Sequence, residues 1–396
     1  MRKILVYING LNGCTLHRLI LPYSTISKDL FEVQLGTDKK DDELFDYIKD
    51  FDIFVFHRLL PDGMLERIKK DCPNTTVICD IDDYWVLSSS HILYNQYRQW
   101  NISERVFHHI QLSDYVTTTT DSLADKIRPV NPNVHVFPNA LIPDGEFEPH
   151  PTQSDKIRFG IIGGSTHFKE ITDNLGGIMT MLPTDVLEKV QFVLCGFDKG
   201  VLQVPQPDGS LKEELMPWEQ NGWTITERAL TSNYKFLSPE HVNFLNTFQQ
   251  GMNYTTEEPY RRVWTRDVWN YATFYDEIDC LLVPLIDSEF NRNKSELKLI
   301  EASVKNKPAI VSDVYPYKIC GINVFDKGGN INPDGNCIMV NDRKGVRAWV
   351  KAITRFVRDK YVRDLITDNL HKLTTGSGAY NLMNVSEKRN QFLSTL

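Results

Sequence analysis

Ile157-Arg158-Phe159-Gly160-Ile161-Ile162-Gly163-Gly164 is the stretch of sequence that decides the fold. A short apolar run that ends in paired glycines predicts a buried parallel strand with a tight turn at its carboxyl end. The chain opens in the same way, because a predicted strand at 3–8 runs into Gly10 and Gly13. Between these openings, the segment 142–156 begins with three prolines in ten residues, which is typical of a linker. We therefore predict an α/β chain with two Rossmann-like, parallel-sheet halves.

Apolar runs and helical stretches alternate along both halves, which predicts where the strands and helices lie. Strands are predicted at 3–8, 31–35, 52–56, 76–79, 115–119 and 134–137, and then at 157–162, 190–195, 280–285, 309–312 and 337–340. Helices are predicted at 92–111, at 121–128 with Asp121 or Ser122 as the cap, and within 345–394.

The predicted domains follow from these elements. The first domain is 1–141, the linker is 142–156, the second domain is 157–365, and a helical tail follows at 366–396. The sequence leaves open whether this tail crosses back to the first domain. Residues 199–262 are polar and aromatic. Two alternatives explain them equally well: an insertion in the second domain, or ordinary helices with long loops. We expect two facing domains with the binding site in a cleft between them.

Composition and charge narrow the function classes. Of 396 residues, 41% are apolar and 24% are charged, as in a soluble globular protein. The net charge is −8, and residues 1–150 carry 15 basic against 22 acidic residues. This acidic balance makes broad binding to nucleic acid unfavourable.

Cysteines and apolar runs indicate the cellular compartment. The seven cysteines are scattered without a CxxC pair, which disfavours a metal or disulfide framework and favours a reducing cytosol. No apolar run reaches the ~18–20 residues of a membrane span, and the apolar start is too short for a signal peptide. We expect a cytoplasmic protein, with peripheral attachment to a membrane as an alternative.

Three acids follow the fourth predicted strand, in Ile78-Cys79-Asp80-Ile81-Asp82-Asp83-Tyr84-Trp85. Such a group is able to bind a metal, act as a general base or accept hydrogen bonds from sugar hydroxyls. The plainer alternative is that Asp82 or Asp83 caps the next helix. We predict a functional role for at least one of them, and no metal site.

Two further stretches suit a phosphate group. Gly164, Ser165, His167 and Lys169 follow the strand at 157–162 and offer backbone amides, a hydroxyl, an imidazole and an ammonium. Gly13 lies in the equivalent turn after the first strand. The alternative is that both are ordinary strand exits with a helix cap.

The strongest site candidate follows the strand at 280–285. Ser295 is predicted to cap a helix, with Lys294 and Lys298 on one face beside its N-terminus and Glu301 one turn further on. Cations at a helix start oppose the helix dipole, which is easier to explain if an anion binds there. The alternative is an amphipathic helix with a solvated face.

Taken in order, these motifs resemble the GT-B glycosyltransferases, in particular the retaining, family 4-like group with a Glu-x7-Glu motif. Residues 13–22 resemble its "GxxxxRxxLP" opening, residues 80–85 its "DxDDxW" strand end, and residues 114–140 the close of its acceptor domain. Residues 290–301 resemble its donor-binding helix.

The resemblance implies transfer of a sugar from a nucleotide diphosphate donor (a UDP- or GDP-sugar) to a glycan, lipid-linked or other hydroxyl acceptor, with retention and without a metal or cofactor. It implies that Glu301 holds the ribose and that the backbone near Ser295 and Glu296 meets the diphosphate. Cationic groups such as Lys298 would stabilise the leaving diphosphate. His57, Asp82 and Asp83 would orient or deprotonate the acceptor.

Two positions depart from the family pattern. The first glutamate of the motif is Asn293, and the arginine expected after Gly164 is Ser165. A degenerate, non-catalytic binding subunit is therefore one alternative, with a nucleotide-sugar epimerase and a DNA-modifying glycosyltransferase as the others.

Overall fold

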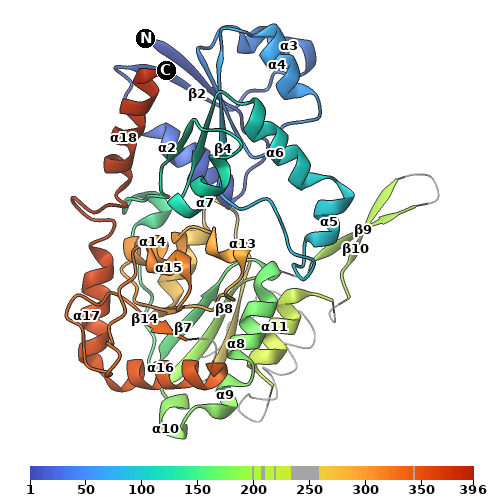
Figure 1. Ribbon diagram of the computed structural model, residues 1–396. Helices are drawn as coiled ribbons and strands as arrows, with labels where there is room; N and C mark the ends of the chain where they lie inside the picture. Colours follow the sequence, from blue (N-terminus) through green and yellow to red (C-terminus); the bar gives the residue numbers. More distant parts are fainter. Residues whose placement is uncertain (199, 207–209, 218–219, 233–257, 342–343) are drawn as a thin grey trace. The chain divides into compact units, whose positions relative to one another are not determined.

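The computed structural model describes residues 1–396 except 199, 207–209, 218–219, 233–257 and 342–343. The chain packs as two compact units, each built around one parallel sheet (Figure 1). Unit 1 comprises Met1–Ile142, Asp287–Ile300 and Leu373–Leu396, and unit 2 comprises Pro143–Ile286 and Glu301–Lys372. The predicted fold class, α/β with two Rossmann-like sheets, is therefore confirmed.

The sheet of unit 1 has the order β2-β1-β3-β4-β5-β6, and every pairing in it is parallel. Its strands are β1 (Arg2–Val6), β2 (Phe31–Leu35), β3 (Ile53–His57), β4 (Thr76–Ile81), β5 (Tyr115–Thr118) and β6 (Val134–Val136). The order reverses at β1, which makes the carboxyl ends of β1 and β3 the topological switch point where open sheets bind ligands.

The helical segments of unit 1 are α1 (Gly13–Thr15), the turn η1 (Leu16–Ile20), α2 (Leu21–Ser24), α3 (Asp41–Ile48), α4 (Met64–Asp71), α5 (Tyr94–Gln99), α6 (Ile102–Leu112), α7 (Asp121–Ile127), α13 (Glu289–Arg292) and α18 (Leu382–Thr395). Of these, α4, α6, α7 and α18 bury apolar side chains in the core of the unit. In the C-terminal helix α18, Leu382, Val385, Phe392 and Leu393 pack into the same core as Ile4 and Val6 of β1.

The sheet of unit 2 is also parallel throughout, with the order β11-β8-β7-β12-β13-β14. Its strands are β7 (Ile157–Ile162), β8 (Val190–Phe197), β11 (Tyr260–Trp264), β12 (Cys280–Val283), β13 (Ala309–Ser312) and β14 (Ile338–Val340), with a separate hairpin of β9 (Val201–Pro205) and β10 (Leu211–Leu215). The order reverses at β7, so its switch point lies at the ends of β7 and β12.

The helices of unit 2 are η2 (Gly145–Phe147), η3 (Ser165–His167), α8 (Phe168–Leu175), α9 (Ile178–Met181), α10 (Thr184–Leu187), α11 (Gly222–Leu230), η5 (Tyr271–Glu277), α15 (Tyr315–Lys318), α16 (Val346–Arg358) and α17 (Lys360–His371). Helix α14 (Leu297–Val304) begins in unit 1 and ends in unit 2. No helix among the described residues is both long and apolar enough to cross a membrane.

Several predicted elements differ from the structure. The single helix expected at 92–111 is two helices, because Asn101 adopts a left-handed conformation with φ of 47° between α5 and α6. The cap of α7 is Thr120, whose side chain accepts a hydrogen bond from the Leu123 amide, rather than Asp121 or Ser122. Of the prediction for 199–262, the parts at 199, 207–209, 218–219 and 233–257 lie outside the described residues.

Candidate functional site

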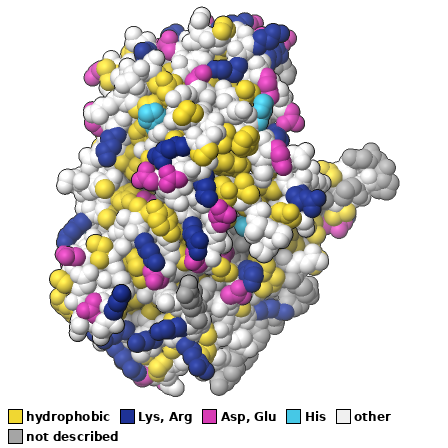
Figure 2. All heavy atoms as spheres, in the orientation of Figure 1, with side chains coloured by type: hydrophobic (Ala, Val, Ile, Leu, Met, Phe, Trp, Pro, Cys, Tyr) yellow, Lys and Arg dark blue, Asp and Glu magenta, His cyan; other side chains and the backbone are white. Residues whose placement is uncertain are grey.

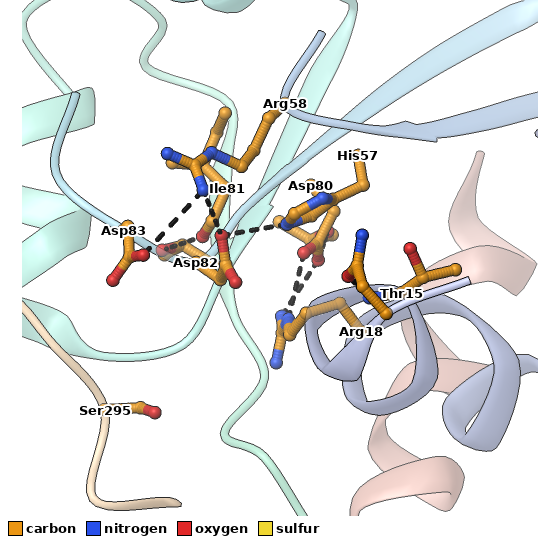
Figure 3. Close-up of polar contacts among 12 residues, drawn as sticks. Thr15, Arg18, His57, Arg58, Asp80, Ile81, Asp82, Asp83 and Ser295 are labelled. Atoms are coloured by element: carbon orange, nitrogen blue, oxygen red, sulfur yellow. Dashed lines mark hydrogen bonds and ion pairs between the residues drawn. The ribbon is translucent and has the colours of Figure 1, made fainter. Parts of the chain in front are cut away.

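The carboxyl ends of β3 and β4 bring five polar side chains together beside the switch point of unit 1 (Figure 3). They come from two neighbouring strands and the residues that follow them. His57 ends β3 and Arg58 follows it, while Asp80 lies in β4 and Asp82 and Asp83 follow that strand. We call this group the strand-end cluster. The sequence predicted its three acids and His57, but not Arg58.

Asp80 has a structural role. Its two carboxylate oxygens accept hydrogen bonds from Nε and Nη2 of Arg18, each at 2.9 Å, and the Thr117 hydroxyl donates a third at 2.6 Å. Arg18 also donates to the Phe137 carbonyl and to the side chain of Asn139. Because Arg18 and Asp80 are each 1% exposed, the pair is an internal brace rather than a ligand site. The Arg18–Asp80 ion pair connects the two predicted motifs at 13–22 and 80–85.

Asp82 faces the histidine of the cluster. His57 Nε2 lies 2.8 Å from Asp82 Oδ1, and both side chains are largely buried. Burial alone would raise the pKa of Asp82, but His57 and then Arg58 outweigh it and hold this pKa well below its usual range. The same carboxylate, together with burial, raises the pKa of the Cys14 thiol well above its ordinary value. Asp82 is therefore a fixed negative charge that orients the imidazole.

Arg58 lies between the two outer acids. Its Nη1 is 3.9 Å from Asp82 Oδ1 and 3.8 Å from Asp83 Oδ2, and its Nη2 donates to the Tyr97 hydroxyl at 2.7 Å. Its φ of 56° is in the left-handed region, which an arginine adopts only at a cost in free energy. Such strain at a strand end is a common property of functional sites. Its place directly after a buried strand was the only sequence signal for Arg58.

The segment 287–300 packs in unit 1 against these strand ends. The Ser122 hydroxyl donates to the side-chain oxygen of Asn293 at 2.8 Å, and the Asn139 amide donates to the Ser295 hydroxyl at 2.9 Å. Lys294 Nζ lies 4.0 Å from Asp83 Oδ1. The structure thus brings Lys294 close to the strand-end cluster, whereas Ser295 contacts Asn139.

Two details of this segment correct the sequence prediction. Lys294 follows α13 and precedes α14, so it does not share a helical face with Lys298, which belongs to α14. Since α14 begins at Leu297, the capping position falls on Glu296 instead of Ser295. The Glu296 side chain is buried, and burial raises its pKa although Tyr380 donates a hydrogen bond to it.

Asn293 is held away from solvent. Its side chain is 2% exposed, and its amide donates to the Glu289 carbonyl at 2.8 Å while its oxygen accepts from Ser122. This asparagine occupies the position of the first glutamate in the resembled motif, and here it fixes the loop.

The predicted phosphate loop of unit 2 follows β7 at the second switch point. Gly164 precedes η3, which includes Ser165 and His167, and α8 follows directly. His167 Nδ1 lies 2.9 Å from Glu170, and Lys169 Nζ donates to Asp173 at 2.6 Å. The side chains of His167 and Lys169 are therefore each paired with an acid of α8. In unit 1, Gly13 begins α1, which Asn12 caps.

Glu301 lies in a second polar group, in unit 2. Its two oxygens accept hydrogen bonds from the hydroxyls of Tyr271 at 2.7 Å and Tyr275 at 2.6 Å, and its side chain is 1% exposed. Burial and the nearby Glu301 charge raise the pKa of Glu146 to about 7, although the Ala272 amide donates to Glu146. We call Glu146, Tyr271, Tyr275 and Glu301 the tyrosine–carboxylate cluster. The Glu301 carboxylate is thus held by two hydroxyl donors in a buried position.

The acids of the strand-end cluster are arranged around cations. Among the described residues, no group of three or more His, Cys, Asp and Glu side chains is placed to hold a metal ion. The physical reason is that Asp80 turns to Arg18 while Asp82 and Asp83 face Arg58. The three acids close in sequence therefore face two different arginines, Asp80 one of them and Asp82 and Asp83 the other.

Comparisons with known proteins give the fold. No protein-family model and no curated protein sequence matches the chain. Among solved structures, Anabaena HepE in complex with UDP and glucose is similar over 100% of both chains, with a TM-score of 0.61 and 9% identity. The catalytic domain of Arabidopsis thaliana starch synthase IV, bound to ADP and acarbose, covers 99% of this chain and 98% of its own, with a TM-score of 0.54 and 11% identity. An α-glucosyltransferase in complex with UDP-glucose and DNA covers 99% of each chain, with a TM-score of 0.57 and 10% identity. These likenesses show that the chain has the two-domain α/β fold of the GT-B kind.

Proposed function

We propose that the chain is a glycosyltransferase that moves a sugar from a nucleotide diphosphate donor to a hydroxyl acceptor. One observation supports this most. In the segment that resembles a donor-binding site, Lys294 Nζ lies 4.0 Å from Asp83, the neighbour of Asp82 in the strand-end cluster. A group suited to a phosphate and a group suited to a hydroxyl are thus neighbours within one unit.

We assign each of these residues a separate role in the transfer. Lys294, with the backbone amides at the start of α14, stabilises the negative charge that develops on the leaving diphosphate. Asp82 holds His57 through Nε2, which leaves Nδ1 to orient or accept the proton of the acceptor hydroxyl. Arg58 lies within 4 Å of both carboxylates and helps to hold the pKa of Asp82 well below its usual range. Because the Lys294 ammonium offsets part of the charge of the diphosphate, we propose that the transfer proceeds without a metal and retains the anomeric configuration.

Solved proteins of the same fold are in keeping with this proposal. The HepE structure is a complex with UDP and glucose, and the α-glucosyltransferase structure is a complex with UDP-glucose and DNA. For this chain we propose a UDP- or GDP-sugar as the donor. The resemblance of residues 290–301 to a donor-binding helix supports Glu301 as the residue that binds the ribose.

The test is a panel of UDP-, GDP- and dTDP-sugars, first by thermal shift and then by product analysis. One donor should raise the melting temperature by mass action, and slow release of free sugar should follow. His57→Gln should lower transfer about 10²–10⁴-fold while the thermal shift with donor persists.

Other results of the nucleotide-sugar panel would favour a different function. An epimerised nucleotide sugar would identify an epimerase, and donor binding without turnover would identify a binding subunit. Sugar transfer to duplex DNA, with no transfer to glycans, would identify a DNA-modifying enzyme. A panel that neither binds nor reacts would contradict the proposed function.

A further inference from the structure

Helix α16 carries a row of positive charge on its outer face. Arg347, Lys351, Arg355 and Arg358 are exposed, and their spacing of four, four and three residues places them on one side of the helix. The row is about 16 Å long at a rise of about 1.5 Å per residue. The opposite side is apolar and packs in the core of unit 2 through Trp349, Ala352, Ile353, Phe356 and Val357.

No acid in α16 balances this row. The helix contains no Asp or Glu, although the whole chain has a net charge of −8. The next helix, α17, is different, because it mixes Lys360 and Arg363 with Asp364 and Asp368. Like charges four residues apart weaken a helix, so the row is not what helix stability alone favours.

Among the described residues, only two of the four cations in this row form an ion pair. Arg358 donates to both oxygens of Asp185 at 2.9 Å, and Arg355 pairs with Asp359 at 3.2 Å. Within the described part of the chain, Arg347 and Lys351 form no ion pair. Figure 2 shows dark-blue side chains following one another along the lower edge of unit 2, where Figure 1 places α16.

We propose that the outer face of α16 docks the protein on an anionic lipid bilayer. A straight row of cations on a convex helix touches a plane of headgroups along its whole length, whereas it crosses a duplex rod at few phosphates. The exposed side of α16 carries no large apolar residue of the kind that forms the core of a protein–protein interface. Just beyond the row, Tyr361 is 61% exposed, and a tyrosine is suited to the headgroup level.

The binding is electrostatic, with no insertion of the helix. The apolar side of α16 is already used in the core, so only charge attraction remains at the surface. A basic residue close to an anionic leaflet strengthens binding about fivefold, and salt screens this attraction over about 8 Å. The docking face is separate from the strand-end cluster, and the inference does not depend on the proposed function.

The test is sedimentation of the full chain with phosphatidylcholine vesicles, with and without phosphatidylglycerol. We expect binding only to the anionic vesicles and release at high salt. The double variant Arg347→Gln/Lys351→Gln should bind about 30-fold more weakly, since two charges are lost. These two residues are chosen because neither forms an ion pair, so folding should be preserved and is checked by thermal melting.

The matched control is Lys28→Gln/Lys40→Gln, which removes two exposed lysines of unit 1. It should bind anionic vesicles like the unchanged protein. Equal loss in the control, or no preference for anionic over neutral vesicles, would overturn the proposal. Duplex DNA that binds more tightly than the vesicles at the same salt, and through Arg347 and Lys351, would also overturn it in favour of a nucleic-acid surface.

Discussion

The strand-end cluster of unit 1 and the tyrosine–carboxylate cluster of unit 2 both contain carboxylates with little exposure to solvent. The carboxylates of the first cluster lie beside cationic side chains, and those of the second lie beside tyrosines and each other. Asp82 faces His57 and Arg58, which lower its pKa despite burial. Glu301 faces two tyrosine hydroxyls, and the neighbouring Glu146 has its pKa raised to about 7 by burial and by Glu301. A partner cation thus decides whether a buried carboxylate is a fixed charge or a group that titrates near neutrality.

The largest expected effect is on the internal brace of unit 1. Arg18→Met leaves Asp80 buried without its cation, and removing one partner of a buried ion pair costs about 3–5 kcal/mol of unfolding free energy. Urea denaturation measures the loss. Arg67→Met is the control, because its ion pairs with Asp42 and Asp71 are exposed and should contribute little to the unfolding free energy. Similar losses in the two variants would show that Asp80 is not structural.

The next effect concerns the tyrosines of unit 2. Tyr275→Phe removes one of the two hydroxyl donors from a buried carboxylate, which should lower the unfolding free energy by about 1–3 kcal/mol. Tyr97→Phe removes the hydroxyl that accepts from Arg58 at a partly exposed position, and should cost less than about 1 kcal/mol. If Tyr97→Phe proved the more damaging, the contrast between the clusters would be wrong.

A smaller effect is the pH dependence of stability, which should have opposite signs in the two clusters. The pKa of Glu146 is about 7 in the folded protein against 4.5 for the free group, so the folded state binds more protons in this range. Stability should therefore fall as pH rises from about 4.5 to 7. Allowing for partial exposure, we expect a decline of about 1–2 kcal/mol, and Glu146→Gln should abolish it.

Asp82 gives the reverse sign. Its folded pKa lies below the ordinary 3.8, so its contribution is present above this pH and is lost as the pH falls through the folded value. Asp82→Asn should therefore remove part of the acid sensitivity of the protein. Denaturation curves at pH 3, about 5 and about 8 separate the two variants. Equal pH profiles for both variants would contradict the assigned pKa directions.

The sequence predicted the strands better than the contacts between them. The strands at 157–162 and 309–312 lie where expected, because buried parallel strands are continuous apolar runs. The break at Asn101 was missed because a left-handed residue interrupts an otherwise helical pattern, and helical periodicity does not register it.

Site roles depended on contacts between distant residues. The role of Asp80 was not predictable, since its partner Arg18 lies 62 residues away in the chain. Lys294 was predicted on a helix because its spacing to Lys298 is helical, whereas the loop that contains it is fixed by Ser122 and Asn139 from the first domain. A side chain's neighbours in space decide its chemistry, and local periodicity does not reveal them.

The most direct test of the proposed transferase is the effect of Lys294→Ala on donor turnover. With the donor found in the nucleotide-sugar panel, kcat/KM should fall about 10²-fold, because the variant loses a cation that stabilises the leaving diphosphate. Lys28→Ala, at an exposed position of unit 1, should leave kcat/KM unchanged. An unchanged kcat/KM for Lys294→Ala, in a protein that melts at the normal temperature, would contradict the account.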